Sequence, residues 1–168
     1  TLHCDALYDF SIYIIFAIWD FPLWLAERFL HIDALLSTPC LLWAKGIMLP
    51  FLAGTIVFIK KIGTSLGFSR EKNSWCVLIF LSSTFVISSI FVLCQYDIIG
   101  IFFSMVALYY YLNGDMKKFT LFTAVAVTMK TFALFVFLPL LLLKEKKVLK
   151  IVIYTICSLS VFVGSQLI

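Results

Sequence analysis

The chain has 168 residues, of which 63% are hydrophobic and only 13% charged, and its mean hydropathy is +1.09. These values lie outside the range of soluble globular domains, and the net charge of +4 accompanies no recognisable nucleic-acid-binding module. The apolar residues fall in runs of about 20, enough for a helix to cross a bilayer core of roughly 30 Å. We therefore predict an all-α protein, a polytopic membrane helix bundle.

Residues 1–38 form the first predicted unit, an external loop region with amphipathic helices on the membrane surface. The region contains five acidic residues and one basic residue, interleaved with aromatic and aliphatic side chains. Acidic loops are typical of the outer side, and segments 10–19 and 24–36 suit helices that lie on the surface. Pro22 fixes its own φ and biases Phe21 away from helical geometry, so we expect a helix to end or restart there.

Residues 39–168 are predicted to form the transmembrane bundle, and the charges of its loops set its orientation. The loop at 60–74 carries four basic residues and one acid, so it should face the cytoplasm. The chain opens on Thr1 and closes on an apolar run, so we expect it to be part of a larger membrane domain. The predicted elements are spans at 41–59, 75–93, 98–112 and 148–168, and a hairpin at 119–143.

The segment 119–143 is predicted to be a broken, re-entrant helical hairpin. One straight crossing would leave the basic residues 144–150 outside and would place Lys130 near the middle of the bilayer. A charge at that depth costs about 2.5–3.5 kcal/mol on insertion scales. Two short arms, 119–128 and 132–143, remove both difficulties if their junction lies in a polar cavity open to the outer face.

The segment Cys94-Gln95-Tyr96-Asp97 is a short polar interruption between two long apolar runs. The loop charges place this turn on the outer face of the membrane. Lys130, at the junction of the hairpin, should lie near Gln95 and Asp97. The simpler interpretation, a solvated turn between two spans, remains open.

Three charged residues outside this turn are candidates for chemistry. Asp20 has large apolar neighbours, which disfavour the charged carboxylate and suit a general base, although a helix cap is an alternative. Lys130 is a candidate because charges inside membranes are usually functional, and Lys45 is most simply an interface anchor. His3 and His31 have no partner at metal-ligand spacing, so we predict no metal ligand among them.

Three motifs, in this order along the chain, resemble the GT-C class of membrane glycosyltransferases. The segment 19–23 (WDFPL) resembles the Asp-Tyr-Pro-Pro-Leu motif of the dolichyl-phosphate-glucose glucosyltransferases of N-glycan assembly. The turn 94–97 (CQYD) resembles their Phe-Gln-Tyr-Asn turn and the Gly-Gln-Tyr/Phe-Asp turn of bacterial mannosyltransferase-like relatives. The segments 128–130 (TMK) and 138–140 (LPL) resemble the family's hairpin. The departures are one proline in place of two and a cysteine at 94.

The resemblance implies an inverting hexosyltransferase that uses a polyprenyl-phosphate sugar as donor. Asp20 would be the catalytic base that deprotonates an acceptor hydroxyl, and Lys130 and Lys45 would bind the donor phosphate. A divalent metal is compatible with this chemistry, although the sequence shows no cluster of ligands for one and implies no certain cofactor. The remaining substrate-binding residues would be Gln95, Tyr96 and Asp97.

The resemblance also implies a location and partners. The protein would be a multi-pass protein of a bacterial plasma membrane with its active site facing outside. Besides the lipid bilayer and the donor, its partner would be a lipid, glycan or protein acceptor, and no nucleic acid.

Two other functions stay open on the residues alone. A transporter or lipid flippase would use the broken hairpin as a binding site near the membrane midplane. A non-catalytic membrane subunit would need no such site. Convergence of Asp20, Gln95, Asp97 and Lys130 on one outward cavity would favour the enzyme.

Overall fold

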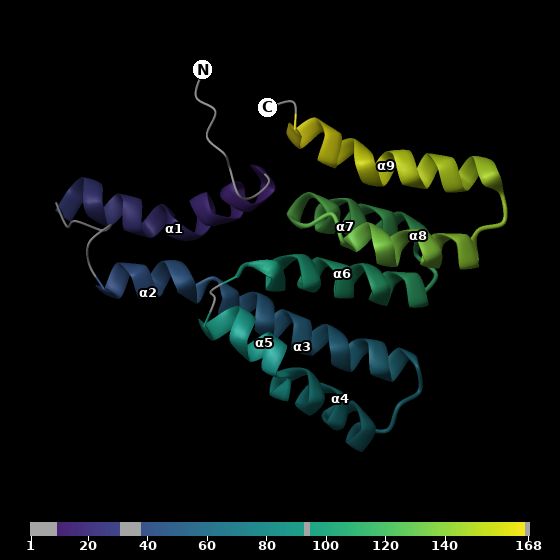
Figure 1. Cartoon of the computed structure of the whole chain (residues 1–168), viewed down its shortest axis with the longest axis horizontal. Coiled ribbons are helices and arrows are strands. Elements are labelled where there is room, and N and C mark those ends of the chain that lie inside the picture. Colours follow the sequence, from purple (N-terminus) through teal and green to yellow (C-terminus); the bar gives the residue numbers. More distant parts are fainter. Residues whose placement is uncertain (1–9, 31–37, 93–94, 167–168) are drawn as a thin grey trace.

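The computed structural model describes residues 10–30, 38–92 and 95–166, and every regular element in these ranges is helical (Figure 1). The predicted all-α class is confirmed for this part of the chain. A π-helical turn, Ser88–Val92, follows the fifth helix. The α-helices are α1 (Phe10–Leu30), α2 (Thr38–Gly46), α3 (Met48–Ser65), α4 (Arg70–Ser82), α5 (Thr84–Ile87), α6 (Asp97–Leu112), α7 (Met116–Met129), α8 (Ala133–Lys144) and α9 (Val148–Gln166).

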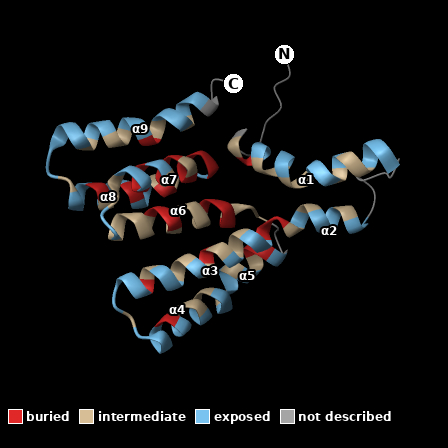
Figure 2. Ribbon diagram, turned by 180° about the vertical axis from the view of Figure 1, so that it is seen from behind, coloured by how far each residue is buried: buried red, intermediate tan, exposed pale blue. Residues whose placement is uncertain are grey.

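The centre of the described fold is α7, which packs between α6 and α9, while α6 packs in turn on α3. Buried residues gather on α7 and on the parts of α6 and α8 that face it (Figure 2). Small side chains at such contacts let helix backbones approach closely, which favours helix association in a membrane. The small buried residues of α7 are Thr120, Thr123, Ala124, Ala126 and Thr128.

The helices turn back at two opposite ends of the molecule (Figure 1). One end holds the turns at 66–69, 113–115 and 145–147, and we call it the basic end. The other, which we call the Lys130 end, holds the start of α6 and the break between α7 and α8.

Cations dominate the basic end. Three acidic residues accompany them there, at positions 71, 115 and 145. Ten of the thirteen lysine and arginine residues lie in its turns or in the helix ends beside them: Lys60, Lys61, Arg70, Lys72, Lys117, Lys118, Lys144, Lys146, Lys147 and Lys150.

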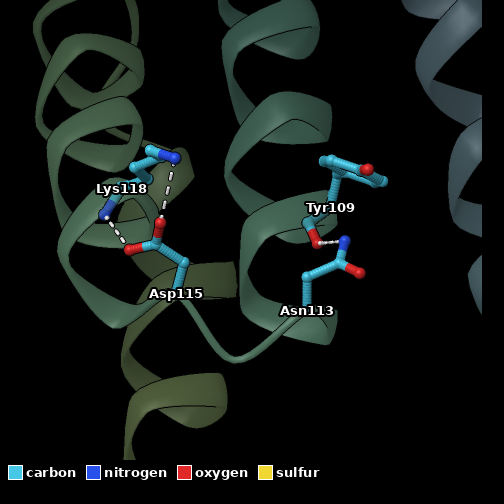
Figure 3. A network of polar contacts seen from close by, with 4 residues as sticks. All are labelled: Tyr109, Asn113, Asp115 and Lys118. Atoms are coloured by element: carbon cyan, nitrogen blue, oxygen red, sulfur yellow. Dashed lines mark hydrogen bonds and ion pairs between the residues drawn. The ribbon is translucent and has the colours of Figure 1, made fainter.

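The turn from α6 to α7 shows how side chains close the helix ends at the basic end (Figure 3). The side chain of Asp115 accepts a hydrogen bond from the backbone N–H of Lys118 at 3.1 Å and pairs with its Nζ at 3.2 Å. The amide of Asn113 donates to the backbone carbonyl of Tyr109 at 2.8 Å. Asp115 therefore caps α7, while Asn113 satisfies a carbonyl of the last turn of α6.

The prediction that a helix ends or restarts at Pro22 is wrong, because α1 continues through this residue. A proline removes one intrahelical hydrogen bond and its ring crowds the carbonyl four residues earlier, here that of Ile18, so packing must compensate for the helix to continue. Trp19 stacks on Trp43 before the proline. Asp20 consequently lies inside a helix, so its interpretation as a helix cap is also wrong.

Two predicted spans differ from the helices observed. The span 41–59 corresponds to a longer run, α2 and α3, with a turn at Ile47, where Pro50 lacks the N–H that would bond Gly46. The span 75–93 is bent by 52° after α4. Ser83 is extended there, with ψ of 119°, and hydroxyl side chains that compete for backbone groups surround it.

The break predicted near Met129 lies where α7 ends, and α8 begins at Ala133. Among the described residues, the run Thr38–Ser65 is long and apolar enough to cross a membrane. The bent pair after it makes a second candidate span if it is counted as one, and α6, α8 and α9 are apolar but shorter. Cys94, and the end of the predicted surface segment 24–36, lie outside the described residues.

Candidate functional site

The turn at 95–97 and the break between α7 and α8 meet at the Lys130 end. Nζ of Lys130 lies 2.5 Å from Oδ1 of Asp97, which begins α6. A Cβ built on Gly100 would lie 3.8 Å from Cβ of Lys130, so the first turn of α6 runs beside the break. The structure therefore brings together two of the residues that the sequence singles out for substrate binding.

The two partners of this ion pair differ in exposure. The side chain of Asp97 is only 16% exposed, whereas that of Lys130 is 46% exposed and lies over the ring of Phe132 at 5.9 Å. A lysine ammonium has three donors, and Asp97 occupies one of them. Lys130 can thus bind an external anion while Asp97 holds it in place.

Gln95 and Tyr96 are fixed by neighbouring elements. The backbone N–H of Gln95 donates to the carbonyl of Ser89 at 2.8 Å, and the hydroxyl of Ser89 lies 3.5 Å from Oε1 of Gln95. The ring of Tyr96 packs edge-on against Phe16 of α1, with 4.4 Å between ring centroids. These contacts tie the polar turn both to the π-helical turn before it and to α1.

Asp20 lies on α1, one helical turn after Phe16. Side chains four residues apart share a helix face, so Asp20 is on the face of α1 that meets the polar turn. Oδ1 of Asp20 is buried and has no hydrogen-bond partner among the described residues. Burial raises the pKa of Asp20 above its ordinary value of 3.8, because the charged form loses solvation.

The position of α1 depends on a pair of tryptophans. Trp19 donates from Nε1 to the carbonyl of Trp43 at 2.8 Å, and Trp43 donates back to the carbonyl of Trp19 at 3.1 Å. Their rings stack with 5.1 Å between centroids. This reciprocal pair links α1 to α2 directly beside Asp20.

A largely apolar groove of about 400 Å³ lies between α1 and the junction of α2 and α3. Its walls include Trp19 and Pro22, the two residues that flank the Asp20–Phe21 dipeptide, together with Trp43 and Pro50. The groove offers space for a hydrocarbon chain, and Asp20 follows its lining residue Trp19 in the sequence without lining the groove itself.

Two predicted residues are not joined to the Lys130–Asp97 pair. Lys45 is exposed on α2, and no hydrogen bond or ion pair between described residues connects it with the pair. Asp20 likewise forms no hydrogen bond or ion pair with Lys130 or Asp97 in that part of the chain, and the contact that ties its helix to the polar turn is the one between Phe16 and Tyr96. The binding role of Lys45 stays a prediction.

The described residues contain no group of three or more His, Cys, Asp or Glu side chains that could hold a metal ion. Asp20 and Asp97 stand on different elements without a shared third ligand. These residues do not fit a metal site, so we assign no step of the chemistry to a metal.

Sequence reasoning missed Phe16, Trp43 and Ser89, which position the candidate residues. Phe16 and Trp43 are ordinary apolar positions in the sequence, and their role depends on which helices meet. For Ser89, the hydroxyl residues at 82–84 and 88–89 were the available signal. Searches of known protein families, curated proteins and solved structures find no match to this chain.

Proposed function

We propose that the chain belongs to a multi-pass membrane glycosyltransferase that transfers a hexose from a polyprenyl-phosphate sugar to an acceptor hydroxyl with inversion. The observation that carries the proposal is the Lys130–Asp97 pair at the helix break. Lys130 is a fixed, half-exposed cation that can bind the donor phosphate. Asp20 of α1 is the carboxylate that we propose as the base. Such a transfer requires these two groups.

The surface of the helices supports a membrane location. Phe29, Phe135 and Leu149 are exposed over 74%, 81% and 73% of their surfaces, on α1, α8 and α9. Soluble monomers rarely expose extended apolar patches, whereas lipid-facing helices do so over most of their length. The basic end then faces the cytoplasm under the positive-inside rule, and the Lys130 end faces outward.

The proposed chemistry is a single displacement. The carboxylate of Asp20 takes the proton from the acceptor hydroxyl, whose oxygen forms a bond to the anomeric carbon. The bond from that carbon to the polyprenyl-phosphate oxygen breaks, and its electron pair leaves with the phosphate. Lys130 stabilises the charge that gathers on the phosphate, because a preorganised cation needs no reorganisation during the reaction.

The remaining residues position the reactants. Asp97 holds Lys130, and Gln95 and Tyr96 offer hydrogen-bonding groups for sugar hydroxyls at the same end. The groove beside Trp19 takes part of the polyprenyl chain. The raised pKa of Asp20 makes its carboxylate a better base than an exposed one, provided that it is ionised at the working pH.

Asp20→Asn in the full-length protein tests the proposal. We expect sugar transfer from a defined polyprenyl-phosphate hexose to fall by at least about a hundredfold, the lower range for loss of a general base. Expression and membrane insertion should persist, since the amide is isosteric. Glu27→Gln, which neutralises an exposed acid on the same helix, is the matched control. Full transfer by the Asp20→Asn protein would remove Asp20 from the mechanism.

The break between α7 and α8 also favours a second candidate, a transporter or lipid flippase. Transporter sites are commonly formed where helices are interrupted, as the chain is at Lys130. This candidate predicts movement of a lipid-linked anion across vesicles by the reconstituted protein without any glycosidic bond formation. Sugar transfer that depends on Asp20 would exclude it as the main activity.

A further inference from the structure

A second groove, of about 390 Å³, lies at the basic end between α3 and α4. It is far from the candidate catalytic residues, which gather at the Lys130 end (Figure 1). Its lining residues are Lys60, Thr64, Phe68, Arg70, Asn73 and Ser74. The sugar-transfer proposal uses none of them.

The groove has a fixed framework. Asn73 of α4 is buried, and its amide donates to the carbonyl of Lys60 and to Oγ1 of Thr64, each at 3.2 Å. A Cβ on Gly63 would lie 1.8 Å from Oδ1 of Asn73, so only glycine allows this approach. The side chain of Asn73 therefore holds α3 and α4 together at the groove.

The charge of the groove is positive. Lys60 and Arg70 line it, no acidic residue does, and neither cation forms an ion pair with another described residue. The hydroxyls of Thr64 and Ser74 donate to backbone carbonyls of their own helices. The ammonium and the guanidinium are thus the donors left for a ligand, and both groups favour phosphate.

The surface next to the groove indicates which kind of molecule would bring a phosphate to it. Trp75, next to Ser74, is 56% exposed, and tryptophans in this position are typical of the membrane interface. Ile79, one helical turn further along α4, is 66% exposed and extends the apolar surface away from the groove. A phosphate in the groove would therefore have acyl chains along α4.

We infer that this groove binds the headgroup of an anionic phospholipid of the cytoplasmic leaflet. Basic pockets between helices on that side are suited to such headgroups. The inference shares membrane insertion with the proposed function but does not depend on sugar transfer. Gly63 and Asn73 would then shape the pocket that holds the headgroup.

Quenching of Trp75 fluorescence by brominated lipid tests the inference. The full-length protein is reconstituted in phosphatidylcholine vesicles that contain brominated phosphatidylglycerol or, for comparison, brominated phosphatidylcholine, and a Trp75→Phe protein supplies the background. We expect preferential quenching by phosphatidylglycerol. Lys60→Gln and Arg70→Gln should each weaken that preference roughly fivefold, in line with one basic residue near an anionic surface.

Matched variants separate the groove from general surface charge. Lys146→Gln combined with Lys147→Gln removes two cations of the same end and should leave the preference unchanged, and Arg70→Lys should keep most of it. Equal loss in the control pair, or unchanged preference after removal of Lys60 and Arg70, would overturn the inference. Displacement of the lipid by millimolar inorganic phosphate would instead assign the groove to a soluble anion.

Discussion

Asp97 and Lys130 differ in exposure, and this difference decides what the pair can do. A mostly buried carboxylate needs its cation, because an uncompensated buried charge is strongly unfavourable. The half-exposed cation, in contrast, keeps access to an external ligand. The pair is therefore better suited to binding an anion than a surface ion pair with both partners in water.

We expect Lys130→Gln to lower the transfer rate by about 10² to 10³, the usual effect of removing one group that stabilises transition-state charge. Asp97→Asn should also lower the rate, and the double variant should be no worse than the Lys130 variant, because the two residues act as a unit.

A transfer assay with saturating donor measures these rates, and Lys117→Gln provides the control. Lys117 is an exposed lysine at the basic end, far from the proposed reaction. Additive effects of the Lys130 and Asp97 variants would show that Asp97 acts independently of Lys130.

Single residues differed in how well the sequence could predict them. Lys130 stood out because a charge inside a long apolar run has few favourable places in a membrane. The Trp19–Trp43 pair could not be predicted, since its two backbone acceptors are defined only once α1 and α2 are side by side. The placement of Asp20 inside a helix was also hidden, because the local effect of Pro22 was outweighed by packing.

Among the elements, helix class was predictable and helix shape was not. Apolar runs predicted where α6 and α9 lie, and the charge at Lys130 indicated the break after α7. The bend after α4 depends on Ser83 adopting an extended conformation, which neighbouring serines favour but do not require. Proline gave opposite results, since α1 passes Pro22 whereas the helix turns near Pro50.

The cap of α7 allows a prediction for a whole element. Asp115→Ala should lower the thermal stability of the protein, because it leaves N–H groups of the first turn without a partner. Asp115→Ser should retain most of the stability, since serine is also a good cap. Circular dichroism of the purified protein in detergent measures the difference near neutral pH.

The pH dependence of this cap has a definite sign. Hydrogen bonds from the backbone and then the side chain of Lys118 hold the pKa of Asp115 below its ordinary value of 3.8. A lowered pKa contributes stability that is fully present above 3.8 and is lost as the pH falls through the folded-state value. The difference between wild type and Asp115→Ala should therefore shrink only below about pH 3.8. A difference that shrinks at higher pH would contradict the assignment.

Across the described part of the chain, charged residues gather at the two ends of the helices, and exposed apolar residues lie along the helices between them. The basic end carries most of the cations, and the Lys130 end carries the Lys130–Asp97 ion pair. In a membrane this arrangement leaves one orientation favourable. Under the proposed orientation, the two grooves would face opposite leaflets, with the apolar one outside and the cationic one inside.

Labelling of single cysteines can test which end of the molecule faces outside. Single cysteines are introduced as Thr131→Cys at the break and Lys147→Cys at the basic end, in a protein whose five native cysteines are replaced by alanine. Both positions are exposed in the structure, so access to reagent depends on the side of the membrane. An impermeant maleimide added to intact cells should label position 131 and spare position 147 until the membrane is opened. Labelling of 147 alone would reverse the orientation and place the Asp20 chemistry on the cytoplasmic side. Labelling of both would mean that the segment 119–143 crosses the bilayer once and leaves position 147 outside, which the re-entrant hairpin excludes.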